Sequence, residues 1–138
     1  MQNRVTVKWL LAAVAVVCIG SGVYYADLLR SAFLRNPVPR SAESIARGRQ
    51  LFGKNCAVCH GPEGRGDGEV AAALPQRPED LASIAPPPIF PDGVVAYRII
   101  NGVNMMPAFK STLSENEIWD LLNFIRSLAP EKQKSAER

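Results

Sequence analysis

The chain has 138 residues, which is enough for one domain, and its net charge is +3. That positive charge comes from the two ends, because residues 41–130 carry eight Lys and Arg against ten Asp and Glu, a balance of −2. This distribution excludes the clustered basic surface of nucleic-acid-binding proteins, so we expect no nucleic-acid partner.

An uncharged segment lies close to the N-terminus. Residues 9–26 read WLLAAVAVVCIGSGVYYA, eighteen residues without a charge. A helix needs about 20 such residues to cross a bilayer, with a range of roughly 17–25. Trp9 at one end and Tyr24-Tyr25 at the other suit the two interfaces, where aromatic side chains gather. We therefore predict an N-terminal transmembrane helix, with residues 1–26 as the membrane anchor and residues 9–26 in contact with lipid.

A cleaved secretory signal is the alternative for the same segment. Arg4 and Lys8 would form its basic start, and the GSG sequence at 20–22 would serve as a small-residue cleavage site. Cys18 fits either interpretation as a small apolar residue of the helix. Basic residues stand on both sides of the apolar run, so the positive-inside rule does not settle its orientation. We expect the uncleaved anchor.

Residues 27–40 are predicted to form a tether. The first part, DLLRSAFLRN, places apolar residues on one helical face and would either continue the anchor helix or lie on the membrane surface. Asn36-Pro37-Val38-Pro39 then ends any helix, because each proline disfavours helical backbone at the residue before it. At the other end of the chain, residues 131–138 are charged and lack an apolar period, which predicts a solvated tail.

Residues 41–130 form the predicted compact domain, and three helices are expected within it. The first covers residues 42–55, where apolar residues recur near the helical period. The second covers residues 93–101, with Asp92 as its N-cap and Gly102 as the left-handed residue after its end.

The last helix has the clearest signals. Residues 114–117 read SENE, which is a capping box, and an apolar stripe follows it. The residues of that stripe are Ile118, Leu121, Leu122 and Ile125.

The sequence CAVCHG at residues 56–61 pairs Cys56 with Cys59 and places His60 directly after them. Zinc sites, redox dithiols and covalent haem attachment all use cysteines at this spacing. Zinc takes four ligands and only three are present here, since Cys18 lies in the apolar run. A redox dithiol belongs at a strand-to-helix junction, and no strand-like alternation surrounds Cys56. Haem attachment uses all three side chains: two thiols bond to the haem and His60 is the proximal iron ligand.

A haem that carries electrons is best closed on both faces, which requires a second axial ligand. Met105 and Met106 are the candidates, because a thioether is a soft, neutral ligand and raises the reduction potential of the iron. Met106 precedes Pro107, which imposes an extended backbone on it. We predict His60 and Met106 as the iron ligands. Ligation by Met105 is the alternative, and core packing of both methionines is the remaining interpretation.

CAVCHG, then GRGDG, then MPAF before an amphipathic last helix together resemble a class I cytochrome c, over residues 44–129. The resemblance implies an all-α fold that wraps one covalent haem c, with the first and last helices of the domain crossing near the haem edge. Gly48, Phe52 and Cys56 match the spacing of the family. Gly48 would allow the close crossing because it has no side chain.

The resemblance also implies that a proline carbonyl in the loop after the attachment motif accepts a hydrogen bond from the second ring nitrogen of His60. Pro75 and Pro78 are the candidates, and both stay open. Three side chains are available to the haem propionates, although a solvated surface position is the simpler interpretation of each: Arg77, Tyr97 and Arg98.

The sequence therefore predicts single-electron transfer between redox protein partners at a membrane, by a tethered c-type cytochrome and not by an enzyme. Because c-type haem is attached outside the cytoplasm, we expect the domain on the periplasmic side of a bacterial inner membrane. A fixed haem subunit of a larger respiratory or dehydrogenase complex is the alternative. An open-site haem enzyme or gas sensor is more remote, because a ligating Met106 argues against it.

Overall fold

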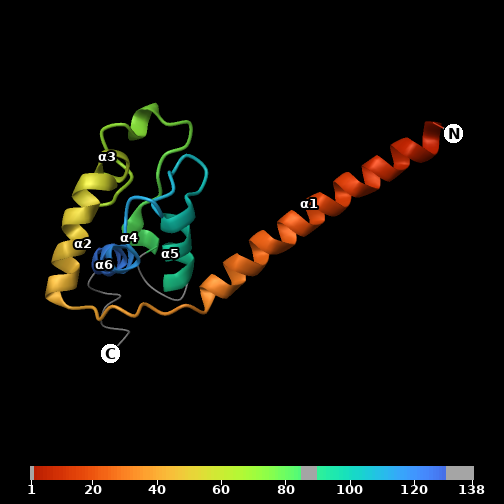
Figure 1. Ribbon diagram of the computed structural model, residues 1–138. Helices are drawn as coiled ribbons and strands as arrows, with labels where there is room; N and C mark the ends of the chain where they lie inside the picture. Colours follow the sequence, from red (N-terminus) through yellow and green to blue (C-terminus); the bar gives the residue numbers. More distant parts are fainter. Residues whose placement is uncertain (1, 85–89, 130–138) are drawn as a thin grey trace.

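The structure, a computed structural model, describes residues 2–84 and 90–129, and the regular structure in those ranges is helical (Figure 1). The all-α prediction is confirmed. The predicted tail at 131–138 lies outside the described residues. The helices in chain order are α1 (Gln2–Ala32), α2 (Ala42–Asn55), α3 (Ala57–His60), η1 (Ala71–Ala73), α4 (Leu81–Ile84), α5 (Asp92–Asn101) and α6 (Glu115–Ser127).

Helices α2 and α6 cross closely, and Gly48 lies at the crossing. A Cβ atom on Gly48 would stand 2.7 Å from the carbonyl carbon of Asp120 and 2.9 Å from Cβ of Phe124, with the Asp120 carbonyl oxygen closer still. No side chain fits there, so the two backbones approach as only glycine permits. Beside the contact, the rings of Phe52 and Phe124 lie 5.1 Å apart between centroids. The predicted role of Gly48 is thus confirmed by the geometry.

Side-chain caps begin two of the three predicted helices. The Ser41 side chain caps α2 by accepting from the Ser44 amide, and the Ser114–Glu117 capping box opens α6. Helix α5 differs, because Asp92 is its first residue instead of its N-cap. The Asp92 carboxylate instead pairs with the buried guanidinium of Arg126 at 2.8 Å. The carboxylate that was predicted to cap the helix therefore forms an ion pair with a residue far away in the sequence.

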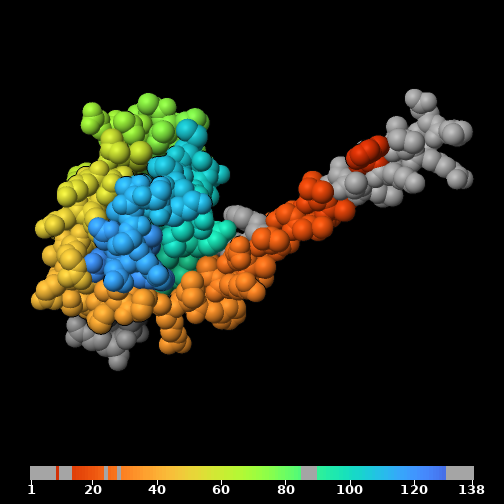
Figure 2. Space-filling model, in the orientation of Figure 1, coloured from red at the N-terminus to blue at the C-terminus, as the bar shows by residue number. Residues whose placement is uncertain are grey.

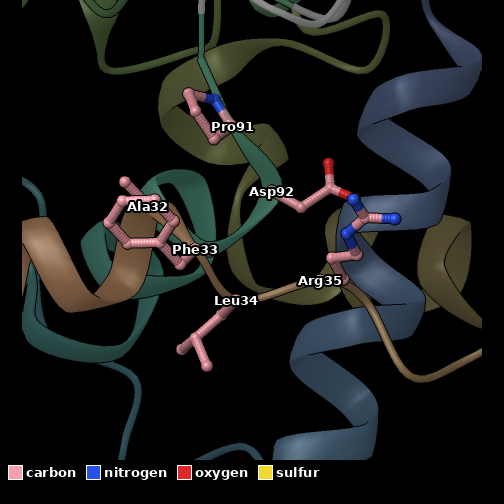
Figure 3. A pocket seen from close by; sticks show the side chains of 6 residues that line it. All are labelled: Ala32, Phe33, Leu34, Arg35, Pro91 and Asp92. Carbon is pink, nitrogen blue, oxygen red and sulfur yellow. The ribbon is translucent and has the colours of Figure 1, made fainter.

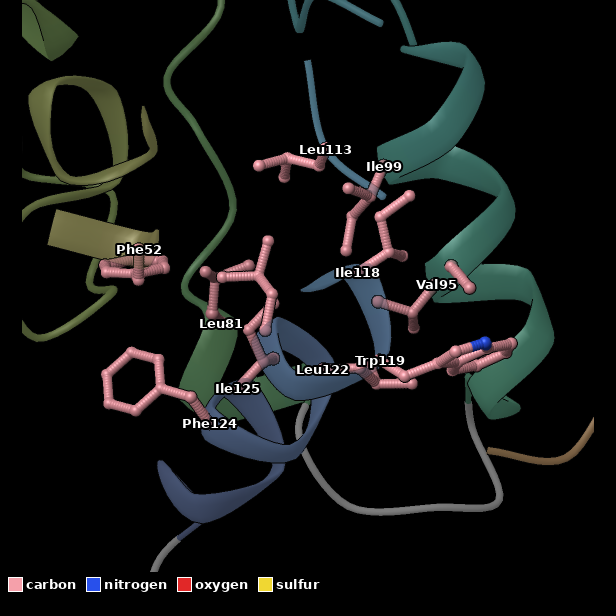
Figure 4. Close-up of a cluster of buried hydrophobic side chains, with 12 residues drawn as sticks. Phe52, Leu81, Val95, Ile99, Leu113, Ile118, Trp119, Leu122, Phe124 and Ile125 are labelled. Atoms are coloured by element: carbon pink, nitrogen blue, oxygen red, sulfur yellow. The ribbon is translucent and has the colours of Figure 1, made fainter. Parts of the chain in front are cut away.

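The core lies between α2, α5 and α6 (Figure 4). The aromatic pair from α2 and α6 occupies one side, and the aliphatic side chains of α5 and the chain before α6 occupy the other. The predicted stripe of α6 is fully part of it. The buried apolar residues of this cluster are Phe52, Leu81, Val95, Ala96, Ile99, Leu113, Ile118, Trp119, Leu121, Leu122, Phe124 and Ile125.

A buried polar network ties α2 to α6. The hydroxyl of Ser44 donates to Asp120 at 2.6 Å, and the guanidinium of Arg47 donates to both carboxylate oxygens of Asp120 at 2.7 and 2.9 Å. Asn123 donates to the Ser44 hydroxyl at 2.8 Å. The hydrogen bonds from Arg47 lower the pKa of Asp120, so this buried carboxylate remains ionised and paired.

Residues 33–41, here called the strap, follow the base of the domain and lie against α6 (Figure 2). Asn36 donates to the side chain of Asn123 at 2.9 Å, and Arg40 donates to the carbonyl of Arg126 at 2.9 Å. The segment predicted as a tether at 27–40 is helical up to Ala32, so its first part continues the helix of the predicted anchor, which is one of the two alternatives given for it. Beyond Ala32 it is bonded to the domain, which the sequence did not indicate.

Helix α1 extends away from the domain as an arm (Figure 2). Among the described residues it is the one helix long and apolar enough to cross a membrane, over Val14–Ala32. Its last turn contacts the domain: Ser31 is buried, and its carbonyl lies where a Cβ atom of Gly93 in α5 would stand. The predicted anchor at 1–26 is thus the larger part of a longer, continuous helix.

Candidate haem-attachment site

The attachment motif lies at the end of α2 that is remote from the strap (Figure 1). Cys56 follows α2, its amide donating to the Phe52 carbonyl at 2.9 Å, and α3 begins at the next residue. The His60 amide donates to the Cys56 carbonyl at 2.9 Å. One turn of backbone thus carries Cys56, Cys59 and His60, and both thiols are half-buried and unpaired.

The loop after the motif folds back over α3. The amides of Gly66 and Gly68 donate to the carbonyls of His60 and Cys59, at 2.8 and 3.1 Å. A Cβ atom on Gly68 would lie 2.5 Å from the carbonyl carbon of Cys59, so this approach requires glycine. The glycines of residues 61–68 therefore fix the backbone of the attachment turn.

His60 is oriented by a backbone carbonyl. Its Nδ1 lies 3.4 Å from the carbonyl oxygen of Glu79, which leaves Nε2 as the nitrogen for a metal. The resemblance implied the carbonyl of Pro75 or Pro78 for this role. In the structure the carbonyl of Glu79, the residue after Pro78, lies beside the ring instead. The Pro78 carbonyl oxygen lies where a Cβ atom of Gly66 would stand. Glu79 carries no sequence signal for this role, because every residue has a carbonyl.

The Cys56 thiol is protonated in this environment, whereas His60 has the protonation state that metal ligation needs. Burial raises the pKa of the Cys56 thiol to about 12, with a further contribution from the nearby Cys59. Burial lowers the pKa of His60, although its bond to the Glu79 carbonyl opposes that effect. The imidazole is therefore neutral near pH 7, which is the form that binds metals.

The donor set decides between the chemistries that the motif allows. Across residues 2–84 and 90–129, no three side chains of the types His, Cys, Asp and Glu gather as a metal site. A zinc site therefore lacks its ligands. The motif also lies between two helices. A redox dithiol would require a strand-to-helix junction.

Met106 is held by a tight turn. Its amide and carbonyl both pair with Val103, at 2.9 and 3.1 Å, and Asn104 inside the turn has a φ of 50°. Gly102, with a φ of 75°, packs directly against the turn, because a Cβ atom on it would lie 2.6 Å from the Met106 carbonyl oxygen. Met105 is 61% exposed, whereas Met106 is half-buried against the core. The structure thus brings Met106 to the core and leaves Met105 in solvent.

The residues suggested for haem propionates have other contacts in the protein. Arg77 donates through Nε to the Gly66 carbonyl at 3.0 Å. The guanidinium of Arg98 lies 5.0 Å from the centroid of the Phe90 ring. Tyr97 is half-buried on α5. A role for these three side chains at propionates stays a prediction.

The residues fit a covalently attached haem better than any other group the motif allows. Two thiols and a neutral imidazole lie on one turn, and Cys56 and Met106 pack against the same apolar cluster. One thioether and one imidazole would close both faces of an iron, with two cysteines left for the porphyrin.

Known proteins resemble this chain over its helical domain. A family model described as cytochrome c oxidase, cbb3-type, subunit III, matches residues 43–125. Cytochrome c6 of Alaria esculenta is 31% identical over 81 residues, which is 59% of this chain and 87% of that protein. Cytochrome c6 of Diacronema lutheri is 32% identical over 85 residues, covering 62% of this chain and 96% of that protein.

A solved structure also resembles this chain. A chain of the Kuenenia stuttgartiensis reducing HAO-like protein complex superimposes with a TM-score of 0.60 at 28% identity. The match covers 72% of this chain and 49% of that one, so this chain spans about half the length of its structural neighbour. The family match begins at residue 43, after α1 and the strap.

Proposed function

Because this chain belongs to the class I c-type cytochromes, with one covalently bound haem c and a role in electron transfer, we propose that it is a membrane-tethered carrier of single electrons whose iron is held by His60 and Met106. The observation that carries the proposal is the shared placement of Cys56 and Met106 against one apolar cluster, with His60 on the same turn as Cys56.

Each of these residues has a separate task. Cys56 and Cys59 bond the haem to the end of α2. The Glu79 carbonyl fixes the tautomer of His60 and makes its Nε2 a stronger donor. Met106 supplies a neutral sulfur that favours the ferrous state. When bound, the haem supplies the one-electron redox change, and the protein sets the potential through these ligands and the surrounding apolar core.

The tethering rests on α1. A helix with an apolar window of 19 residues is long enough to cross a bilayer, and α1 continues without a break into the last turn that contacts the domain. Since haem c is attached outside the cytoplasm, the proposal places the domain on the periplasmic face of a bacterial inner membrane. Alkaline carbonate extraction and the mass of the mature chain test it: a signal cleaved at 20–22 would leave a soluble chain that lacks the first two thirds of α1.

A fixed subunit of a larger oxidoreductase is the second candidate. One observation favours it: the structural neighbour is part of a complex. Mild detergent extraction of native membranes separates the two candidates. A free carrier migrates alone on a native gel, whereas a subunit migrates with its partners.

A matched pair of variants tests the iron ligands. We expect Met106→Ala in the haem-loaded chain to lower the reduction potential and to open the iron to carbon monoxide, because one axial ligand is lost. Met105→Ala is the control, since this exposed side chain should leave the potential and the spectrum unchanged. A Met106→Ala protein that keeps a methionine-ligated haem spectrum would contradict the assignment.

A further inference from the structure

Apolar and basic side chains gather where α1 meets the domain. Phe33 is 85% exposed, and Leu29 and Leu34 are 64% and 55% exposed. Arg30 and Arg35 are exposed between and beside them. We call these five residues the collar. Single exposed apolar residues are ordinary, but three within six positions form a patch that indicates a contact surface.

The collar is held in a fixed position relative to the domain. The amides of Phe33 and Leu34 donate to the carbonyls of Arg30 and Ser31, at 3.1 and 3.0 Å, and so continue α1 into the strap. Ser31 is buried against Gly93 of α5, where no side chain could be added. The strap then bonds to α6. The collar therefore cannot turn independently of the haem domain.

The length of α1 sets the depth of the collar in a bilayer. Eighteen residues from position 9 to 26 rise about 27 Å, close to the thickness of about 30 Å of a hydrocarbon core. The seven residues from 27 to 33 then add about 10 Å, whereas the headgroup layer on each side is roughly 5–8 Å thick. If the apolar window at 14–32 crosses instead, Phe33 lies at the hydrocarbon boundary. The first placement carries Phe33 to the outer edge of the headgroups or past it, whereas the window found in the structure, 14–32, brings the collar to the boundary between acyl chains and headgroups.

The charge around the collar suits a phosphate-bearing surface. Figure 3 shows a pocket formed by the chain at 32–35 together with Pro91 and Asp92 at the start of α5. Arg35 lines that pocket together with Asp92, whose carboxylate is paired with Arg126. Basic residues beside a span are attracted to an anionic lipid surface.

We propose that the collar is a lipid-contact surface, in which Leu29, Phe33 and Leu34 lie at the acyl boundary and Arg30 and Arg35 bind lipid phosphates. The partner is the bilayer in which α1 stands, and the inference rests on the proposed tethering. Its consequence is that the haem domain is docked on the membrane at one orientation and does not swing on a flexible tether. An electron partner must then reach the haem from the membrane surface or from the adjoining periplasm.

Photo-crosslinking in native membranes identifies what touches the collar. Phe33 is replaced by the photoreactive benzoyl-phenylalanine in the full chain, and the mass of the irradiated, purified protein is measured. Gln50 takes the same replacement as a control, because it is exposed on α2, the helix on the other side of the domain from α1 (Figure 1). We expect a phospholipid adduct at position 33 and none at position 50.

The other outcomes overturn the proposal. A protein adduct at position 33 would assign the collar to a subunit interface, and no adduct at either position would place it in water. Carbonate extraction of the same membranes separates the two levels of inference. A chain released by carbonate refutes the tethering and this proposal together, whereas a retained chain without a lipid adduct refutes this proposal alone.

Lipid composition tests the role of the arginines. In nanodiscs, replacing part of the phosphatidylcholine by phosphatidylglycerol should raise the lipid-adduct yield at position 33 severalfold. Arg30→Gln with Arg35→Gln should abolish that increase while leaving the haem spectrum unchanged. If the adduct yield still rises with phosphatidylglycerol in the double variant, the two arginines do not bind the lipid phosphates.

Discussion

Replacing Gly48 by alanine would place a methyl group in the crossing of α2 and α6. Its carbon would stand 2.7 Å from the Asp120 carbonyl carbon and 2.9 Å from Cβ of Phe124. Real Cβ atoms do not approach other atoms this closely, and the nearest obstacle is backbone and not a flexible side chain. The two helices would therefore have to move apart.

The expected loss of stability follows from two opposing effects. Overpacking a core typically costs about 1–3 kcal/mol, and a backbone obstacle favours the upper end of that range. Alanine improves the helix by about 0.5–1 kcal/mol relative to glycine. The net loss should be about 2 kcal/mol. Separation of the helices would also weaken the contact between Phe52 and Phe124.

The assay is guanidinium unfolding of the haem-loaded chain in detergent, followed by haem absorbance, because α1 does not contribute to that signal. Gly53→Ala is the matched control in the same helix: its Cβ would meet no atom within 4 Å. Alanine there should stabilise the protein by about 0.5–1 kcal/mol. If Gly48→Ala were as stable as Gly53→Ala, the close crossing of the two helices would be refuted.

Three further changes test the domain by the same unfolding measurement or by spectroscopy. Ser114→Ala should cost about 1 kcal/mol, because the Glu117 amide loses its acceptor; an unchanged midpoint would contradict the capping box. Asp120→Asn should cost about 1–3 kcal/mol, toward the lower end because the Arg47 side chain is 57% exposed. The pKa of Asp120 is lowered in the folded state, chiefly by Arg47, so the stability that this ion pair contributes should be lost as pH falls through that lowered pKa. The Asp120→Asn variant should not show this loss. Equal acid sensitivity of the variant and the wild type would contradict the role of the ion pair. Gly102→Ala should weaken the methionine-to-iron absorption band, since a Cβ atom would lie 2.6 Å from the Met106 carbonyl oxygen; an intact band would show that the turn is not needed for ligation.

Several parts of the fold are readable from short stretches of sequence. Helix α2 covers the predicted residues 42–55, and the capping box starts α6 where it was expected. These features depend on interactions within three or four residues, so the local sequence contains all the groups involved. The attachment motif is of the same kind, because Cys56, Cys59 and His60 lie on one turn.

Short helices between the long ones were not predicted. Helices α3, α4 and η1 have only three or four residues each, too few for an apolar period to be recognised. They lie in the segments around the attachment motif and the following loops. Their backbone is held by long-range hydrogen bonds such as that of the Leu81 amide to the Gly64 carbonyl at 2.7 Å.

The sequence by itself indicated the attachment motif and Met106 before a proline as candidate ligand, and its resemblance to a family implied the close crossing at Gly48. The tertiary structure alone decided which carbonyl faces His60, what Asp92 pairs with, and that the strap is bonded to the domain. Glu79 lies 19 residues from His60, and Asn123 lies 87 residues from Asn36. Such contacts join groups that many residues possess, such as carbonyls and amides, so only the folded path of the chain selects the partners.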